Sequence, residues 1–117
     1  MSLYGMMRTG VSGLAAQANR LSTVADNIAN SSTTGYKRAK TEFSSLVMPN
    51  LANSYNSGGV TTTVMNSITQ QCVLQYTTSA TDLAINGDGF FVVQNANGQT
   101  FLTRAGAFVP DAQGRLV

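Results

Sequence analysis

Few residues in this chain have the chemistry or the spacing that a catalytic or metal site needs. The 117 residues include no histidine, so the commonest general base and metal ligand is missing. Cys72 is the only cysteine, which excludes an internal disulfide and a zinc ribbon. The acidic residues show no pairing suited to acid–base catalysis, and Asp82, Asp88 and Asp111 lack the dense spacing of a calcium loop. We expect no enzymatic activity, no metal and no cofactor.

Two short motifs could indicate a nucleotide-binding loop and a nucleic-acid-binding patch, and we disfavour both interpretations. Gly87-Asp88-Gly89 lacks the third glycine of a dinucleotide loop and leads into a strand rather than a helix. The only basic cluster, Lys37, Arg38 and Lys40, is too small to predict nucleic-acid binding, although aromatic residues lie nearby. We expect Cys72 to be a small residue in a strand, and its being native or an introduced label is left open.

No segment of the sequence predicts membrane insertion or a cleaved signal peptide. No apolar run approaches the 18 residues that predict a membrane span. The first 21 residues lack the basic start and continuous apolar core of a signal peptide. Charged residues make up 10% of the chain, against about 25% in typical soluble domains, and this scarcity suits packing against copies of itself.

Residues 2–30 carry the clearest pattern, that of a long helix with one apolar seam. Apolar residues recur at alternating steps of three and four, as in the a and d positions of a coiled coil. Ser2 is the expected N-cap, and the Ser- and Thr-rich stretch after residue 30 ends the helix. The seam consists of Tyr4, Met7, Val11, Leu14, Ala18, Leu21, Ala25 and Ile28.

This helix needs a partner to be stable. Gly5, Gly10 and Gly13 each weaken it by up to about 1 kcal/mol relative to alanine. The sequence contains no second heptad pattern, so we expect the partner helix to come from another chain or from sequence beyond Val117.

The remaining sequence predicts a linker followed by β structure. Residues 31–59 indicate irregular structure, with a short helical turn at 42–48 ended by Pro49. Residues 60–64 alternate as in a strand, and residues 73–76 continue that character. Three turns follow, at 86–89, 95–98 and 111–114, and each is predicted to join two antiparallel strands (83–85 with 90–93, 90–93 with 100–103, and 108–109 with 116–117).

Together these patterns predict an α+β fold in three consecutive regions. A coiled-coil helix occupies residues 1–30, an extended linker 31–70, and the start of an antiparallel, hairpin-rich β domain 71–117. Because the sequence stops inside an apparent strand, we expect the domain to be incomplete and the chain to be part of a longer one.

Three blocks of sequence resemble the flagellar rod and hook family. Asp26-Asn27-Ile28-Ala29-Asn30, followed by Gly35-Tyr36-Lys37, is similar to its NNIAN and GYK motifs, with Asp26 in place of the usual Asn. Residues 82–93 resemble its DLAIxGxGFF segment, and residues 103–117 its TRxGxFxxDxxGxLV segment. The matched signature residues are Asn27, Ile28, Ala29, Asn30, Gly35, Tyr36, Lys37, Asp82, Gly87, Gly89, Phe90, Phe91, Arg104 and Gly106.

The resemblance implies a structural subunit of a hollow, flexible tube. The opening residues are most similar to hook members, with distal rod members as the near alternative. The family pattern implies that the helix packs with the subunit's own C-terminal helix inside a helical polymer. The polar face of the helix would line the export channel, and residues 31–59 would be the compliant connection that lets a universal joint bend.

The resemblance also implies partners and a location. The partners would be further copies, the neighbouring rod, hook-cap and hook-filament junction proteins, and the flagellar type III export apparatus. The location would be the flagellar basal body and hook, reached without a cleaved signal peptide. A secreted adhesin would explain the β-rich half but neither the heptad helix nor the signature. A charged residue at Leu14 or Leu21 is predicted to block polymerisation.

Overall fold

The computed structural model describes residues 2–48 and 57–117 and divides the chain into two compact units. Unit 1 is formed by Met1–Ala29 and Arg38–Ser67, and unit 2 by Asn30–Lys37 and Ile68–Val117. Each unit therefore combines segments that are separated in sequence. The three consecutive regions 1–30, 31–70 and 71–117 stay a prediction for the organisation of a whole subunit.

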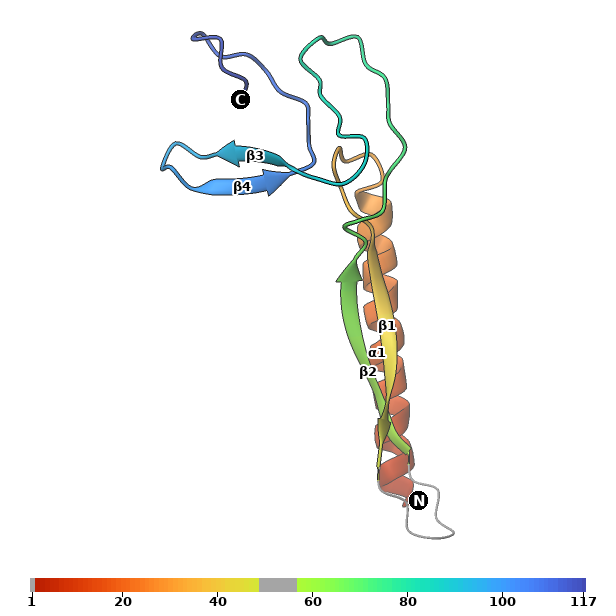
Figure 1. The fold of residues 1–117 in the computed structure, drawn as a ribbon. Helices are drawn as coiled ribbons and strands as arrows, with labels where there is room; N and C mark the ends of the chain where they lie inside the picture. Colours follow the sequence, from red (N-terminus) through yellow and green to blue (C-terminus); the bar gives the residue numbers. More distant parts are fainter. Residues whose placement is uncertain (1, 49–56) are drawn as a thin grey trace. The chain divides into compact units, whose positions relative to one another are not determined.

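Unit 1 is built on one long helix, α1 (Leu3–Ala29) (Figure 1). Its first turn is capped by Ser2, whose hydroxyl oxygen accepts a hydrogen bond from the Gly5 amide at 3.2 Å. The Ser2 carbonyl accepts a second bond, from the Met6 amide. The predicted helix and its N-cap are confirmed.

A long antiparallel hairpin runs alongside α1 in unit 1. It consists of β1 (Ala39–Val47) and β2 (Ser57–Asn66), with Ala39 opposite Asn66 and Ser45 opposite Val60 (Figure 1). The prediction of irregular structure over 31–59 is confirmed for 31–38 and wrong for 39–47 and 57–59, while 49–56 lie outside the described residues. The helical turn predicted at 42–48 is wrong, whereas a strand at 60–64 is confirmed. Pro49, the predicted end of that turn, lies outside the described residues.

The error has a physical cause. The sequence of β1 is rich in Ser, Thr and charged residues, which are typical of loops when the chain is considered alone. In the structure the Thr41 hydroxyl binds Thr23 of α1, and the backbone of Ala39 binds the Asn27 side chain of α1. Polar contacts with distant residues therefore stabilise the strand. Local sequence patterns do not contain that information.

Unit 2 contains one short hairpin, formed by β3 (Phe91–Gln94) and β4 (Thr100–Thr103). Its turn is closed by the Asn95 amide, which donates to the Gln99 carbonyl at 2.8 Å. Near the chain's end, Val109 and Val117 exchange two backbone hydrogen bonds of 2.9 Å across the turn at 111–114. The turns predicted at 95–98 and 111–114 are confirmed.

The predicted hairpin around residues 86–89 is wrong. Gly87 and Gly89 do adopt positive φ angles of 104° and 134°, but no strands pair across them. Instead the Leu83 amide donates to the Gly106 carbonyl at 2.8 Å, and Asp82 forms a bridge with Ala107. Residues 73–76, predicted as a strand, are irregular, and so is Cys72, which is exposed.

The described residues bury very little apolar surface. Ala16, at 4% exposure, is the only buried hydrophobic residue among them. Val73 and Tyr76 are 98% and 97% exposed, and most of the large apolar side chains of α1 are exposed as well. A folded domain of this size normally buries most of its large apolar side chains, so much of this surface is available for association.

Candidate assembly surface

One face of α1 packs against the β1–β2 hairpin. The residues on this face recur at steps of three and four along the helix, in parallel with the apolar seam, and all are small or polar: Thr9, Ser12, Ala16, Asn19, Thr23 and Asn27. Ala16 and Thr23 are the buried positions, at 4% and 7% exposure. Small side chains let the hairpin approach the helix closely, so this face is occupied within the chain.

Two side chains of α1 bind the backbone of the hairpin at its edges. The Ser12 hydroxyl donates to the Val60 carbonyl and accepts from the Val60 amide, both at 2.9 Å. The Asn27 carboxamide donates to the Ala39 carbonyl at 2.8 Å and accepts from the Ala39 amide at 2.9 Å. Each side chain thus satisfies both backbone groups of one strand residue, as a neighbouring strand would.

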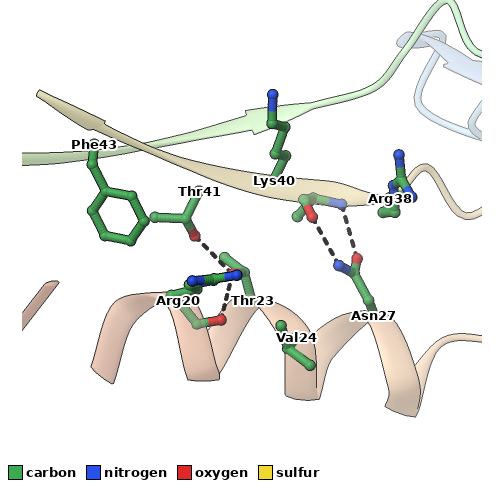
Figure 2. A pocket seen from close by; sticks show the side chains of 9 residues that line it. Arg20, Thr23, Val24, Asn27, Arg38, Lys40, Thr41 and Phe43 are labelled. Carbon is green, nitrogen blue, oxygen red and sulfur yellow. Dashed lines mark hydrogen bonds between the residues drawn. The ribbon is translucent and has the colours of Figure 1, made fainter. Parts of the chain in front are cut away.

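A chain of hydroxyl groups joins α1 to β1 between these two points (Figure 2). The Thr23 hydroxyl donates to the Arg20 carbonyl at 2.8 Å, which uses its only proton. The Thr41 hydroxyl therefore donates to the Thr23 oxygen, over 2.7 Å. Asn19 adds a bond to the Thr62 hydroxyl at 2.8 Å, so the contact between helix and hairpin is polar along most of its length.

The apolar seam lies on α1 away from these contacts and is open. Leu14 and Leu21 are 74% and 70% exposed. The other six seam residues, Tyr4, Met7, Val11, Ala18, Ala25 and Ile28, are also exposed. Burial of a leucine side chain stabilises by roughly 1.5–3 kcal/mol, so covering this seam would give a strong driving force for association. That the seam forms a coiled coil stays a prediction.

Part of the polar face of α1 is occupied within the chain, because Thr9, Ser12, Asn19 and Asn27 bind the hairpin. Sequence reasoning missed this second interface, although its signal was present as a repeat of small and polar residues in step with the seam. That the polar face lines an export channel stays a prediction.

The signature residues of unit 2 have structural roles. Gly106 is buried, and a Cβ there would run into the Leu83 carbonyl and touch the Phe91 ring. Gly35, at φ 78°, would place a Cβ 2.5 Å from the Ala105 amide nitrogen. The Phe91 ring packs edge-on against Phe108, with centroids 5.5 Å apart. Gly35 and Gly106 therefore suit only a residue without a side chain, because backbone segments approach each other closely at both positions.

Arg104 holds the loop that contains the two other signature glycines. Its guanidinium donates to the Gly87 carbonyl at 2.7 Å and to the Ile85 carbonyl at 3.4 Å, and lies 5.4 Å from the centroid of the Phe90 ring. A guanidinium has five donors, which suits this binding of several carbonyl groups at once. Arg104 therefore acts as a brace within unit 2.

The other signature residues are divided between the units. Ile28 and Ala29 form the last turn of α1, and Asn27 grips β1 as described. Asn30 accepts a bond from the Thr33 amide, and Lys37 donates to the Gln70 carbonyl at 2.7 Å. The Tyr36 carbonyl is 3.9 Å from the Cys72 sulfur, and Asp82 accepts from the Thr77 hydroxyl at 2.6 Å. The structure does not gather these residues into one site.

Among residues 2–48 and 57–117, no group of three His, Cys, Asp or Glu side chains could hold a metal ion. The pKa of Asp111 is lowered, chiefly by a hydrogen bond from the Arg115 amide and further by the Gln113 amide and the Arg115 side chain. None of the described helices is long and apolar enough to cross a membrane.

Comparison with known proteins gives two family matches. Residues 7–37 match the family described as flagella basal body rod protein. Residues 84–117 match the D1 domain of the flagellar hook protein FlgE/F/G family. The two matched stretches contain most of the signature residues.

Individual relatives agree with these matches. The whole chain is 68% identical to parts of the flagellar hook protein FlgE of Rhizobium meliloti and of Brucella abortus. A stretch that makes up 90% of the chain is 42% identical to the flagellar basal-body rod protein FlgG of Agrobacterium fabrum. The chain spans 29% and 30% of the two hook proteins and 46% of the rod protein.

Proposed function

We propose that this chain belongs to the flagellar rod and hook family and is the N-terminal part of a hook subunit. Such subunits polymerise into a hollow tube that transmits torque as a universal joint and serves as an export channel. The observation that carries this proposal is the open apolar seam on α1, whose opposite face is already occupied by the hairpin.

The division of α1 into two faces suits a subunit of a many-copy tube. The polar contacts with β1 and β2 fix the helix within its own chain and leave the seam free for a second helix. We infer that the subunit's own C-terminal helix covers part of the seam and that neighbouring copies cover the rest. A monomer that exposed this seam permanently would be prone to association.

Bending requires compliance between parts of the subunit, and we propose a location for it. Residues 31–59 were expected to supply a flexible connection, but 39–47 and 57–66 form a paired hairpin. The chain instead passes between the two units at three points, after Ala29, Lys37 and Ser67. We infer that compliance between the units resides at these crossings.

The remaining partners follow from the same proposal. They are the adjoining rod proteins, the hook cap, the hook-filament junction proteins and the flagellar type III export apparatus, which would deliver the subunit without a cleaved signal peptide. A rod protein is the less supported alternative, because the rod relative is 42% identical whereas the two hook relatives are 68% identical.

The test is polymerisation of the full-length subunit, measured by sedimentation across a range of concentrations. Replacing Leu14 or Leu21 with aspartate should abolish polymers, because a charge would be buried in the seam. Gln17→Asp is the matched control, since it adds the same charge to an exposed position of α1 outside the seam. Normal polymers from the Leu21→Asp subunit would refute the assignment of the seam.

A further inference from the structure

The register of the hairpin shows which backbone groups point away from it. In antiparallel pairs, residues that exchange both hydrogen bonds alternate with residues that exchange none. Ala39 and Val60 each give both backbone groups to a side chain of α1, so neither bonds its strand partner. Ala39 lies at one end of the hairpin and Val60, opposite Ser45, at the other, and both ends predict the same alternation along β1. By that alternation, Thr41 and Phe43 direct their amide and carbonyl groups away from β2, at the outer edge of β1.

A hollow lies beside this edge (Figure 2). It measures about 550 Å³ and is lined by Arg20, Thr23, Val24 and Asn27 of α1 together with residues 38–41 and Phe43. The hollow lies between α1 and β1, with Thr41 and Phe43 directed toward the helix, and no residue of β2 lines it (Figure 2). Its polar floor is already bonded, because Thr23, Thr41 and Asn27 bind one another or the backbone.

The hollow nevertheless offers what an added strand needs. Open backbone groups on β1 supply main-chain hydrogen bonds, and the partly exposed Val24 and Phe43 supply apolar contacts for its side chains. Arg20 lines the hollow from α1, and none of the lining residues is acidic, whereas Lys40 is already paired with Glu42 at 3.1 Å. A long two-stranded ribbon without proline in β1 is an edge that proteins normally cover.

We propose that this hollow receives a third strand, an extended segment with at least one acidic residue that pairs antiparallel or parallel with β1 at Thr41 and Phe43. The segment comes from the same polypeptide, from outside residues 1–117. This inference rests on the proposed function, in which the subunit's own C-terminal helix packs on the seam of α1.

The source of the strand follows from the surroundings of the hollow. Val24 lies between Leu21 and Ile28 of the seam along α1, so the hollow adjoins the surface that the C-terminal helix would cover. A segment that reaches that helix from the Ile28 end of the seam would pass this region. The hook relatives extend well beyond the matched 29% to 30% of their length, and a segment tethered to the same chain has a high effective concentration at the hollow.

The test uses full-length subunits with a photo-crosslinking phenylalanine analogue in place of Phe43, which keeps the ring. Equal amounts of ¹⁵N-labelled and unlabelled subunits are mixed, assembled and irradiated, and the joined peptides are identified by mass spectrometry. We expect a crosslink to a peptide outside residues 1–117, with both peptides carrying the same isotope. The control places the same analogue at Thr63 of β2, which lies opposite Glu42 across the hairpin. From that position the analogue should not reach the peptide.

Amide hydrogen exchange tests whether the segment is a strand. In the full-length subunit, the Thr41 and Phe43 amides should exchange at least about ten-fold more slowly than amides without a hydrogen bond. The Arg20→Glu substitution should remove the protection of the Thr41 and Phe43 amides. It should leave the protection of the Lys40 amide unchanged, because that amide is bonded within the hairpin. Arg8→Glu, the same charge reversal on α1 away from the hollow, should change neither.

Each outcome decides the proposal. Crosslinks that join different isotopes would show that a second copy fills the hollow, and crosslinks within 1–117 or fast exchange at Thr41 and Phe43 would show that no such strand binds. Any of these overturns it. Irradiation of unassembled subunits separates this inference from the proposed function, because a same-isotope crosslink in subunits that never polymerise would support the strand and refute the tube.

Discussion

The grip of Asn27 on β1 gives a prediction whose size follows from the structure. In the Asn27→Ala subunit, the Ala39 amide and carbonyl lose hydrogen bonds of 2.9 and 2.8 Å. Each such bond contributes about 0.5–1.5 kcal/mol net, so the contact between α1 and this end of the hairpin should weaken by about 1–3 kcal/mol. Water reaches this half-buried edge, which keeps the loss from exceeding that range.

Amide hydrogen exchange at Lys40 measures this loss directly. The Lys40 amide is bonded across the hairpin to Met65 and becomes accessible when this end of the hairpin opens. A change of 1–3 kcal/mol corresponds to exchange roughly five- to 150-fold faster. The matched control is Asn19→Ala, which removes one exposed bond to the Thr62 hydroxyl and should accelerate Lys40 by no more than roughly two-fold. Equal effects of the two substitutions would refute the view that Asn27 acts as a substitute strand.

Three further predictions concern single positions. Gly106→Ala should destabilise unit 2 by about 1–3 kcal/mol, because the new Cβ meets the Leu83 carbonyl and neither backbone can move freely; loss of the β3–β4 amide protection would show it, and unchanged protection would contradict it. Gly10→Ala should stabilise α1 by about 1 kcal/mol and raise its helical circular dichroism signal, since no atom lies within 4 Å of the added Cβ; a fall in that signal would count against the open helix face. The folded pKa of Asp111 is lowered, first by the Arg115 amide, so its carboxylate stabilises the turn at 111–114 above the unfolded pKa and that contribution is lost as pH falls through the folded pKa. An NMR titration of the Gly114 amide should report this change, and the Asp111→Asn variant should not show it.

The sequence predicted the elements whose information is local. The 3.5-residue spacing from Tyr4 to Ile28 predicted both the extent of α1 and its apolar seam, and the seam is indeed uncovered. The turns at 95–98 and 111–114 were predicted because Gly98 and Gly114 adopt the positive φ angles that such turns require. In each case, the pattern that predicts the element lies in residues that are close together in the sequence.

The elements that were missed depend on contacts between distant residues. β1 has the composition of a loop, and it becomes a strand because Thr41 and Ala39 bind Thr23 and Asn27 on α1. At 86–89 the glycines do take the conformation of a turn, but a glycine does not determine which strands pair around it. Leu83 pairs with Gly106, where the two backbones are so close that a side chain would not fit. The local sequence does not show this contact.

The most direct test of the account is the solvent accessibility of the seam, measured by thiol labelling of Leu21→Cys in a full-length subunit that also carries Cys72→Ser. Labelling should be fast before assembly and strongly suppressed in the assembled tube, whereas a cysteine at Gln17 should react in both states. Equally fast labelling of position 21 before and after assembly would contradict the claim that the seam holds the subunits together.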